Sequence, residues 1–191
     1  MATTVATAET AASTPFRAKG GERVSDKKIG SNAKRVALVG LFIALAFVFS
    51  WLEFIFPLQI PIPGVKLGIA NLVSLFALYK LKLPDVIAVS LFRIVLAGFL
   101  FGGLSSMIYA LCGGVLSLAV MIALKATSKF SPLAVSVAGG VSHNLGQLAF
   151  ALFAMNTSAV LAYAPALVAG GIASGALVGA LGALVVGKIR L

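Results

Sequence analysis

VALVGLFIALAFVFSWLEFIF, residues 36–56, is a run of 21 residues that contains one charged side chain, Glu53. A helix that crosses the hydrocarbon core of a bilayer needs about 20 apolar residues, so this run is long enough to do so. It is followed by Pro57, which cannot continue a helix because it lacks a backbone N–H donor. The segment therefore predicts a transmembrane helix, and with it a membrane protein.

The composition of the whole chain indicates several such helices. Of the 191 residues, 60% are apolar and 10% are charged, whereas roughly a quarter of a soluble domain is charged. The net charge of +10 comes from bases in the N-terminal tail and between apolar runs, which is where a membrane topology places them, so we predict no nucleic-acid partner. With five acids and one His, we also predict no catalytic residue, metal site or cofactor.

Six apolar segments are long enough, or nearly so, to form helices. They cover residues 36–56, 67–79, 84–102, 105–124, 132–155 and 159–187. Pro84 and Pro132 fall in the first turns of their helices, where a missing N–H costs no hydrogen bond. The second segment is too short to span upright, and we expect the proline-rich loop Gln59–Lys66 before it to fold back over the outer mouth as a lid. The sequence predicts an all-α bundle of six transmembrane helices.

The distribution of Lys and Arg predicts how this bundle is oriented. Residues 1–35 hold seven bases and almost no large apolar side chains, so we expect them to form a disordered tail. With this tail inside, 13 of the 15 bases lie on the cytoplasmic side, Lys66 lies outside and Arg93 lies within a helix. Because cytoplasmic loops carry the excess of bases, we predict cytoplasmic termini and a multi-pass domain over residues 36–191 in the cell membrane.

Small residues recur at a spacing that lets helices approach closely. The last helix carries Gly171, Gly175, Gly179, Ala183 and Gly187. Four-residue spacing places such residues on one smooth ridge, which we expect to pack within the bundle. The first helix carries Gly40 and Ala44 at the same spacing. For this pair the alternative to packing within the bundle is docking to a partner membrane protein.

Polar and ionisable residues at membrane depth usually face a cavity or a partner. The candidates are Glu53, Lys66, Asn71, Arg93, His143, Asn144 and Gln147. At 1.5 Å per residue, Arg93 and His143 lie about 13 and about 16 Å from the inner ends of their helices, close to the midplane. The others extend from this level toward the outer surface. We predict an outward-facing pocket that leans cationic and suits an anionic or strongly polar group.

Each of these residues also has a structural interpretation. The presence of Arg93 and Glu53 could equally reflect an ion pair between them that contributes only to stability. Lys66 is explained by a side chain that reaches the outer headgroups. His143 is explained by a neutral, hydrogen-bonded ring that ties two helices together. The density of polar groups between Ser142 and Gln147 exceeds what helix packing requires, and this favours a site.

Four segments together resemble the Gx transporter family, whose members are often labelled heptaprenyl diphosphate synthase component I. They are KLGIANL at residues 66–72, RIVLAG at 93–98, SMIYALCGG at 106–114 and HNLGQL at 143–148. The family is similar to the S components of energy-coupling-factor transporters. That similarity implies an S-component-like bundle, a lid loop, a small-molecule substrate, and small residues on the first helix, here Gly40 and Ala44, that dock a membrane coupling subunit with its ATPases.

The synthase label can be compared with the residues present. Prenyl diphosphate synthesis uses aspartate-rich motifs to hold Mg²⁺, which prefers carboxylate and phosphate oxygens, but this chain has only Asp26 and Asp85. It also has no phosphate-binding loop of an ATPase. The leading hypothesis is a substrate-binding transporter component for a small polar, anionic or isoprenoid-related molecule. The alternatives are a non-catalytic subunit of prenyl diphosphate or quinone-precursor synthesis, and a scaffold without a ligand.

Overall fold

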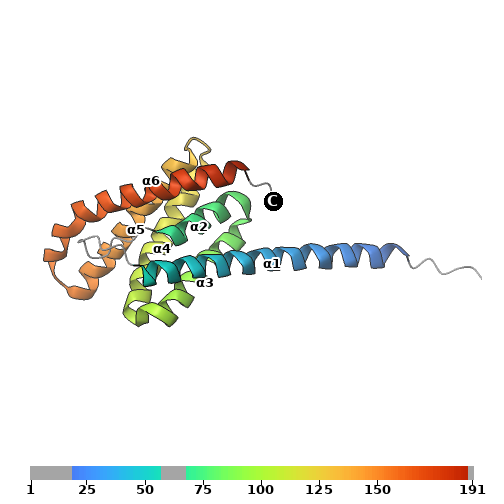
Figure 1. Ribbon diagram of the computed structural model, residues 1–191, viewed down its shortest axis with the longest axis horizontal. Coiled ribbons are helices and arrows are strands. Elements are labelled where there is room, and N and C mark those ends of the chain that lie inside the picture. The colour runs from blue at the N-terminus through green and yellow to red at the C-terminus, as the bar shows by residue number, and fades with distance from the viewer. Residues whose placement is uncertain (1–18, 57–67, 189–191) are drawn as a thin grey trace, which may run out of the picture. The chain divides into compact units, whose positions relative to one another are not determined.

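The computed structural model describes residues 19–56 and 68–188, and these residues contain helices and no strand (Figure 1). The α-helices are α1 (Lys19–Ile55), α2 (Ile69–Lys80), α3 (Leu83–Ala97), α4 (Gly103–Ala126), α5 (Pro132–Met155) and α6 (Ala164–Lys188). A π-helical turn, η1 (Gly98–Gly102), joins α3 to α4, and a 3₁₀ turn, η2 (Ser158–Tyr163), precedes α6. The all-α prediction is confirmed for the described residues, and each predicted helix has a counterpart.

Three helical stretches are long and apolar enough to cross a membrane, and they mark the chain as a membrane protein. They are Asn32–Ile55, Leu83–Ala126 and Ser158–Lys188. The second contains both α3 and α4, which are separated at Gly103 by a backbone with φ 70° and ψ 170°. Helix α5 is not among the three because its polar residues lower its mean hydropathy, and α2 is too short with only 12 residues. Six crossings and cytoplasmic termini therefore stay predictions.

Helix α1 begins earlier than predicted. The backbone of residues 19–35, which we expected to be disordered, is helical, while residues 1–18 lie outside the described part. The physical reason is cooperativity, because the apolar part of α1 supplies the helical nucleus and each further residue adds a hydrogen bond without a new nucleation step.

The chain divides into two units, residues 1–36 and 37–191, and the second holds all the candidate site residues.

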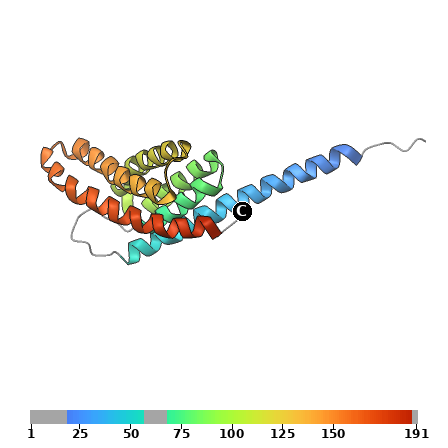
Figure 2. The same ribbon diagram turned by 90° about the horizontal axis from the view of Figure 1, so that it is seen from above.

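Within the second unit, helices α2 to α6 form a closed ring of neighbours. Each of α3, α4, α5 and α6 packs against the helix before it in this order, and α6 also packs against α2. Figures 1 and 2 both show α6 alongside α5. The hydrophobic core lies between these helices and includes Leu75, Val86, Val89 and Val135, each 1% exposed or less.

The predicted glycine ridge of α6 packs against α5 over its first three members. A Cβ atom added to Gly175 would lie 2.7 Å from Val137 Cα, and Gly171 and Gly179 meet the α5 backbone equally closely. The other end of the ridge does not pack in this way, because nothing lies within 4 Å of a Cβ at Gly187. The α5 and α6 backbones are therefore in direct contact only where small residues permit it.

The part of α1 that belongs to the second unit, residues 37–55, packs against the other helices through large side chains. Phe42 stacks on Phe76 of α2 with ring centroids 5.5 Å apart. Phe47 and Phe54 both stack on Phe101 of η1, at 5.2 and 5.5 Å. These contacts place the C-terminal turns of α1 beside the α3–α4 connection, where the candidate site lies.

Candidate functional site

A cavity of about 440 Å³ is lined by residues from every helix of the second unit. This volume falls in the range of small-molecule sites, about 300–1,000 Å³. Six of the seven predicted site residues line it, namely Glu53, Asn71, Arg93, His143, Asn144 and Gln147. The seventh, Lys66, lies outside the described residues, as does the predicted lid Gln59–Lys66. The structure thus brings together residues that are up to 94 positions apart in the sequence.

Arg93 lies on α3 and is only 9% exposed. Its Nη2 donates a hydrogen bond of 2.5 Å to Oδ1 of Asn71 on α2. Its Nε is buried and has no hydrogen-bond partner among the described residues. A buried donor without a partner costs free energy, so Arg93 keeps an unused donor beside the cavity that it lines.

Glu53 reaches from α1 to the start of α2. Its Oε1 accepts a hydrogen bond of 2.5 Å from the backbone N–H of Ile69. The N-cap residue of α2 is Gly68, which has φ 73° and no side chain to cap the helix. Glu53 therefore caps α2 from another helix, where a negative charge is favourable. It also attracts Arg93 electrostatically, while its hydrogen bond to Ile69 is a helix cap that the sequence did not suggest.

The polar residues of α5 divide into two kinds. Asn144 is 7% exposed and its Nδ2 donates to the carbonyl oxygen of Leu167 on α6, at 2.7 Å. Asn144 thus ties two helices together, the role that we had considered for His143. His143 and Gln147 are half-buried and lie against Gly113 of α4, where an added Cβ would come within 2.8 Å of Gln147 Cγ. Glycine at this position leaves room for both side chains.

Sequence reasoning missed several residues of the cavity wall. Ser50, Phe54, Phe101, Ser106 and Ser174 line it, yet single serines and phenylalanines in apolar helices carry little signal. One clue was available, because Ser50 stands three residues before Glu53 and four before Phe54. Residues three or four apart share a helix face, so Ser50 could have been placed beside Glu53.

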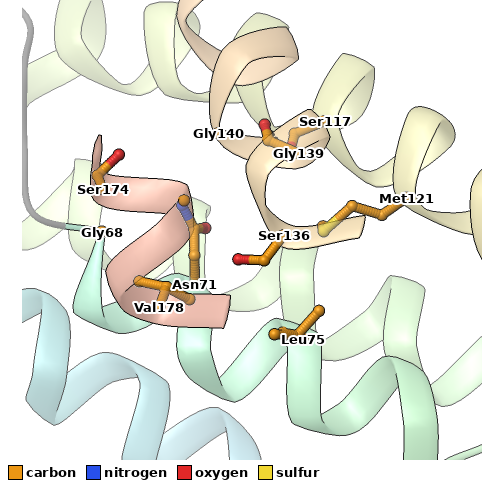
Figure 3. Close-up of a pocket in the computed structure, with 11 residues that line it drawn as sticks. Gly68, Asn71, Leu75, Ser117, Met121, Ser136, Gly139, Gly140, Ser174 and Val178 are labelled. Atoms are coloured by element: carbon orange, nitrogen blue, oxygen red, sulfur yellow. Dashed lines mark hydrogen bonds between the residues drawn. The ribbon is translucent and has the colours of Figure 1, made fainter. Parts of the chain in front are cut away.

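A small crevice of about 20 Å³ adjoins the cavity, between α2, α4, α5 and α6 (Figure 3). Gly68, Asn71, Gly140 and Ser174 line both spaces. Its volume is enough for about one water molecule. Asn71 therefore lies at the junction of the two spaces, and its Oδ1 accepts a hydrogen bond from Arg93.

The predicted docking pair lies on an exposed face of α1. Gly40 and Ala44 are both exposed, and nothing lies within 4 Å of a Cβ built on Gly40. Their neighbours Leu41 and Leu45 are 64% and 42% exposed. Bulky side chains can therefore be introduced at Gly40 and Ala44 without a clash inside this chain.

No cluster of three or more His, Cys, Asp or Glu in the described ranges is placed to hold a metal ion. In comparisons with known proteins, a family model described as heptaprenyl diphosphate synthase component I matches residues 42–185. This match covers all the candidate cavity residues. No curated protein and no solved structure matches the chain.

Proposed function

Because the chain belongs to the heptaprenyl diphosphate synthase component I family, we propose that it binds a small polar, anionic or isoprenoid-related molecule as the substrate-binding component of a membrane transporter. One observation carries the proposal. A cavity of ligand size contains the buried guanidinium of Arg93 together with the amides of Asn71, Asn144 and Gln147. Polar groups at membrane depth usually face a cavity or a partner, and here they converge on one cavity.

The carboxylates of the cavity wall and the motifs of the sequence also indicate whether the chain could catalyse a reaction or hydrolyse ATP. We propose that the chain is not an enzyme by itself, since its cavity wall offers one carboxylate, Glu53, among the described residues. The sequence carries no phosphate-binding loop, so an ATP-driven transporter of this kind would need a partner that hydrolyses ATP. We infer that a membrane coupling subunit with its ATPases supplies the energy.

Mass spectrometry of small molecules that co-purify with the protein tests the proposed function. A cavity-filling change, Ala110→Trp, should remove the bound compound because Ala110 lines the cavity. Ala123→Trp is the matched control, since Ala123 is an exposed residue of the same helix and should leave the compound in place. Equal recovery from both variants, or no compound from the wild type, would contradict substrate binding.

The proposed orientation predicts the result of reporter fusions. Fusions at Lys82, at Lys129 and at the C-terminus should report a cytoplasmic position, and a fusion at Gly103 should report the outside. The reason is the concentration of bases on one side of the predicted bundle. Reporter activity is read in whole cells, with the expression of each fusion as the control. A C-terminal fusion on the outside would rule out an even number of crossings with an inner N-terminus.

Partner docking is tested by the double change Gly40→Leu, Ala44→Leu. We expect it to reduce recovery of the coupling subunit in pull-down experiments by about tenfold, because a smooth small-residue surface lets two helices approach closely. Gly187→Leu is the control, as it adds the same side chain at another position with nothing within 4 Å. Undiminished recovery with the double variant would argue against docking through this face.

A non-catalytic role in prenyl diphosphate synthesis is the second candidate, and the family description favours it by naming a component of a synthase. In that case the chain would associate with a separate catalytic protein. Co-purification with a prenyl diphosphate synthase, and a change in its product length when the chain is added, would support this role. A synthase that works equally well without the chain would exclude it.

A further inference from the structure

We propose that the cavity takes an organic molecule with a single negative charge, such as a carboxylate, on an otherwise uncharged body, and that it disfavours diphosphates. This inference rests on the proposed function, because it names the ligand class of the same cavity. It follows from the charges of the wall, the Nε of Arg93 that is unpartnered within the described residues, and the apolar residues that line the same cavity.

The charge of the wall matches one negative charge better than two. Glu53, Arg93 and His143 are the ionisable side chains among the described lining residues. Glu53 offsets the permanent charge of Arg93, but it also accepts a hydrogen bond from Ile69 at the start of α2, where the helix dipole adds about half a positive charge. Counted over Glu53, Arg93 and this helix end, the sum is slightly positive. A second ligand charge would have no opposite charge left to offset it among these groups.

The hydrogen bonds of Arg93 indicate where the negative group would sit. Nη2 is engaged with Asn71, whereas Nε is buried without a partner in the described part of the chain. Guanidinium groups bind carboxylates through parallel N–H donors. A carboxylate in the cavity would therefore offer acceptors to a guanidinium that has an unused donor, and the amide of Gln147 lines the same cavity.

The rest of the wall suits an uncharged and largely apolar body. Phe54, Ile94, Ala97, Phe101 and Ala110 line the cavity. Phe101 stacks on both Phe47 and Phe54, so its ring is held in place and contributes a fixed apolar surface. Burial of apolar surface would supply affinity, while the polar groups around Arg93 would orient the molecule.

Fluorine NMR with three probes built on one ring tests this ligand class. The probes are 4-fluorobenzoate, with one negative charge, 4-fluorobenzamide, which is uncharged, and 4-fluorophenyl phosphate, with about two negative charges at neutral pH. Binding is measured to the full chain in nanodiscs of phosphatidylcholine, with empty nanodiscs as the blank. We expect 4-fluorobenzoate to bind about tenfold more tightly than either other probe, as is typical of a hydrogen bond to a charged group.

Variants connect this preference to Arg93. Arg93→Gln should lower the affinity for 4-fluorobenzoate to that for 4-fluorobenzamide, and Arg93→Lys should restore part of the difference. Asn71→Asp should lower benzoate binding about tenfold, because the new carboxylate would pair with Arg93, and it remains informative if Arg93→Gln fails to fold. Lys129→Gln removes a charge from an exposed residue outside the cavity and should change nothing.

Two results would overturn the ligand class. Tighter binding of 4-fluorophenyl phosphate would replace it with a multiply charged ligand and leave binding in this cavity standing. Benzoate binding that is absent, or that survives both Arg93→Gln and Asn71→Asp in folded protein, would show that Arg93 does not receive such a group. The proposed function is judged separately by the compound that co-purifies with wild-type protein and is lost from Ala110→Trp.

Discussion

Protein that carries Arg93→Gln together with His143→Ala should lose substrate uptake while it still folds. Arg93 supplies a charged donor to the cavity, and loss of a hydrogen bond to a charged group costs about 1.5–3 kcal/mol, or roughly 10- to 100-fold in affinity. Gln at position 93 loses the hydrogen bond of Nη2 to Asn71 Oδ1, but it also removes a buried charge, whose burial is costly, and these two effects offset each other. We therefore expect near-normal expression and melting temperature. Uptake is measured in cells that express each variant at matched levels.

The same experiment separates a binding role of Arg93 from a structural one. If Arg93 and Glu53 formed a pair needed only for stability, Arg93→Gln would lower the melting temperature and Glu53→Gln would do the same. The structure gives Glu53 a further role as the cap of α2 through Ile69, and a Gln side chain keeps an acceptor for that N–H. Glu53→Gln should therefore remain well folded. Full uptake by a folded double variant would refute the pocket assignment.

Gly175→Leu should destabilise the bundle by about 3 kcal/mol or more, since overpacking typically costs 1–3 kcal/mol even where side chains can adjust. At this position the obstacle is backbone, because an added Cβ would lie 2.7 Å from Val137 Cα and 2.8 Å from the Ser136 carbonyl oxygen. Helices α5 and α6 would have to separate. We expect a large fall in melting temperature in detergent and poor recovery as monodisperse protein.

A matched substitution in the same helix provides the control. Gly187 continues the four-residue spacing of Gly175, but nothing lies within 4 Å of a Cβ there. Gly187→Leu should change the melting temperature little. Gly175→Ala should fall between the two, because it adds only the Cβ. Similar stability for Gly175→Leu and Gly187→Leu would mean that α5 and α6 do not pack through their backbones.

The helices were predicted well because their signals are local. The segment 132–155 was predicted with the bounds that α5 has. Pro132 is typical of a first helical turn, and a mostly apolar run follows it. The start of α1 was wrong by 17 residues, because polar residues extend a helix that an apolar segment has already nucleated. The glycine ridge illustrates the limit of spacing alone, as Gly175 packs on α5 and Gly187 does not.

The sequence by itself determined that this is an apolar, all-helical chain with polar residues near the middle of its helices. Hydropathy and residue type suffice for that, because each acts within one segment. Only the tertiary structure decided that Glu53 caps α2, that Asn71 holds Arg93, and that Asn144 ties α5 to α6. These partners come from helices distant in sequence, and a one-residue rotation of a helix turns a side chain by about 100°. Pairing therefore depends on how the helices pack, which no single segment encodes.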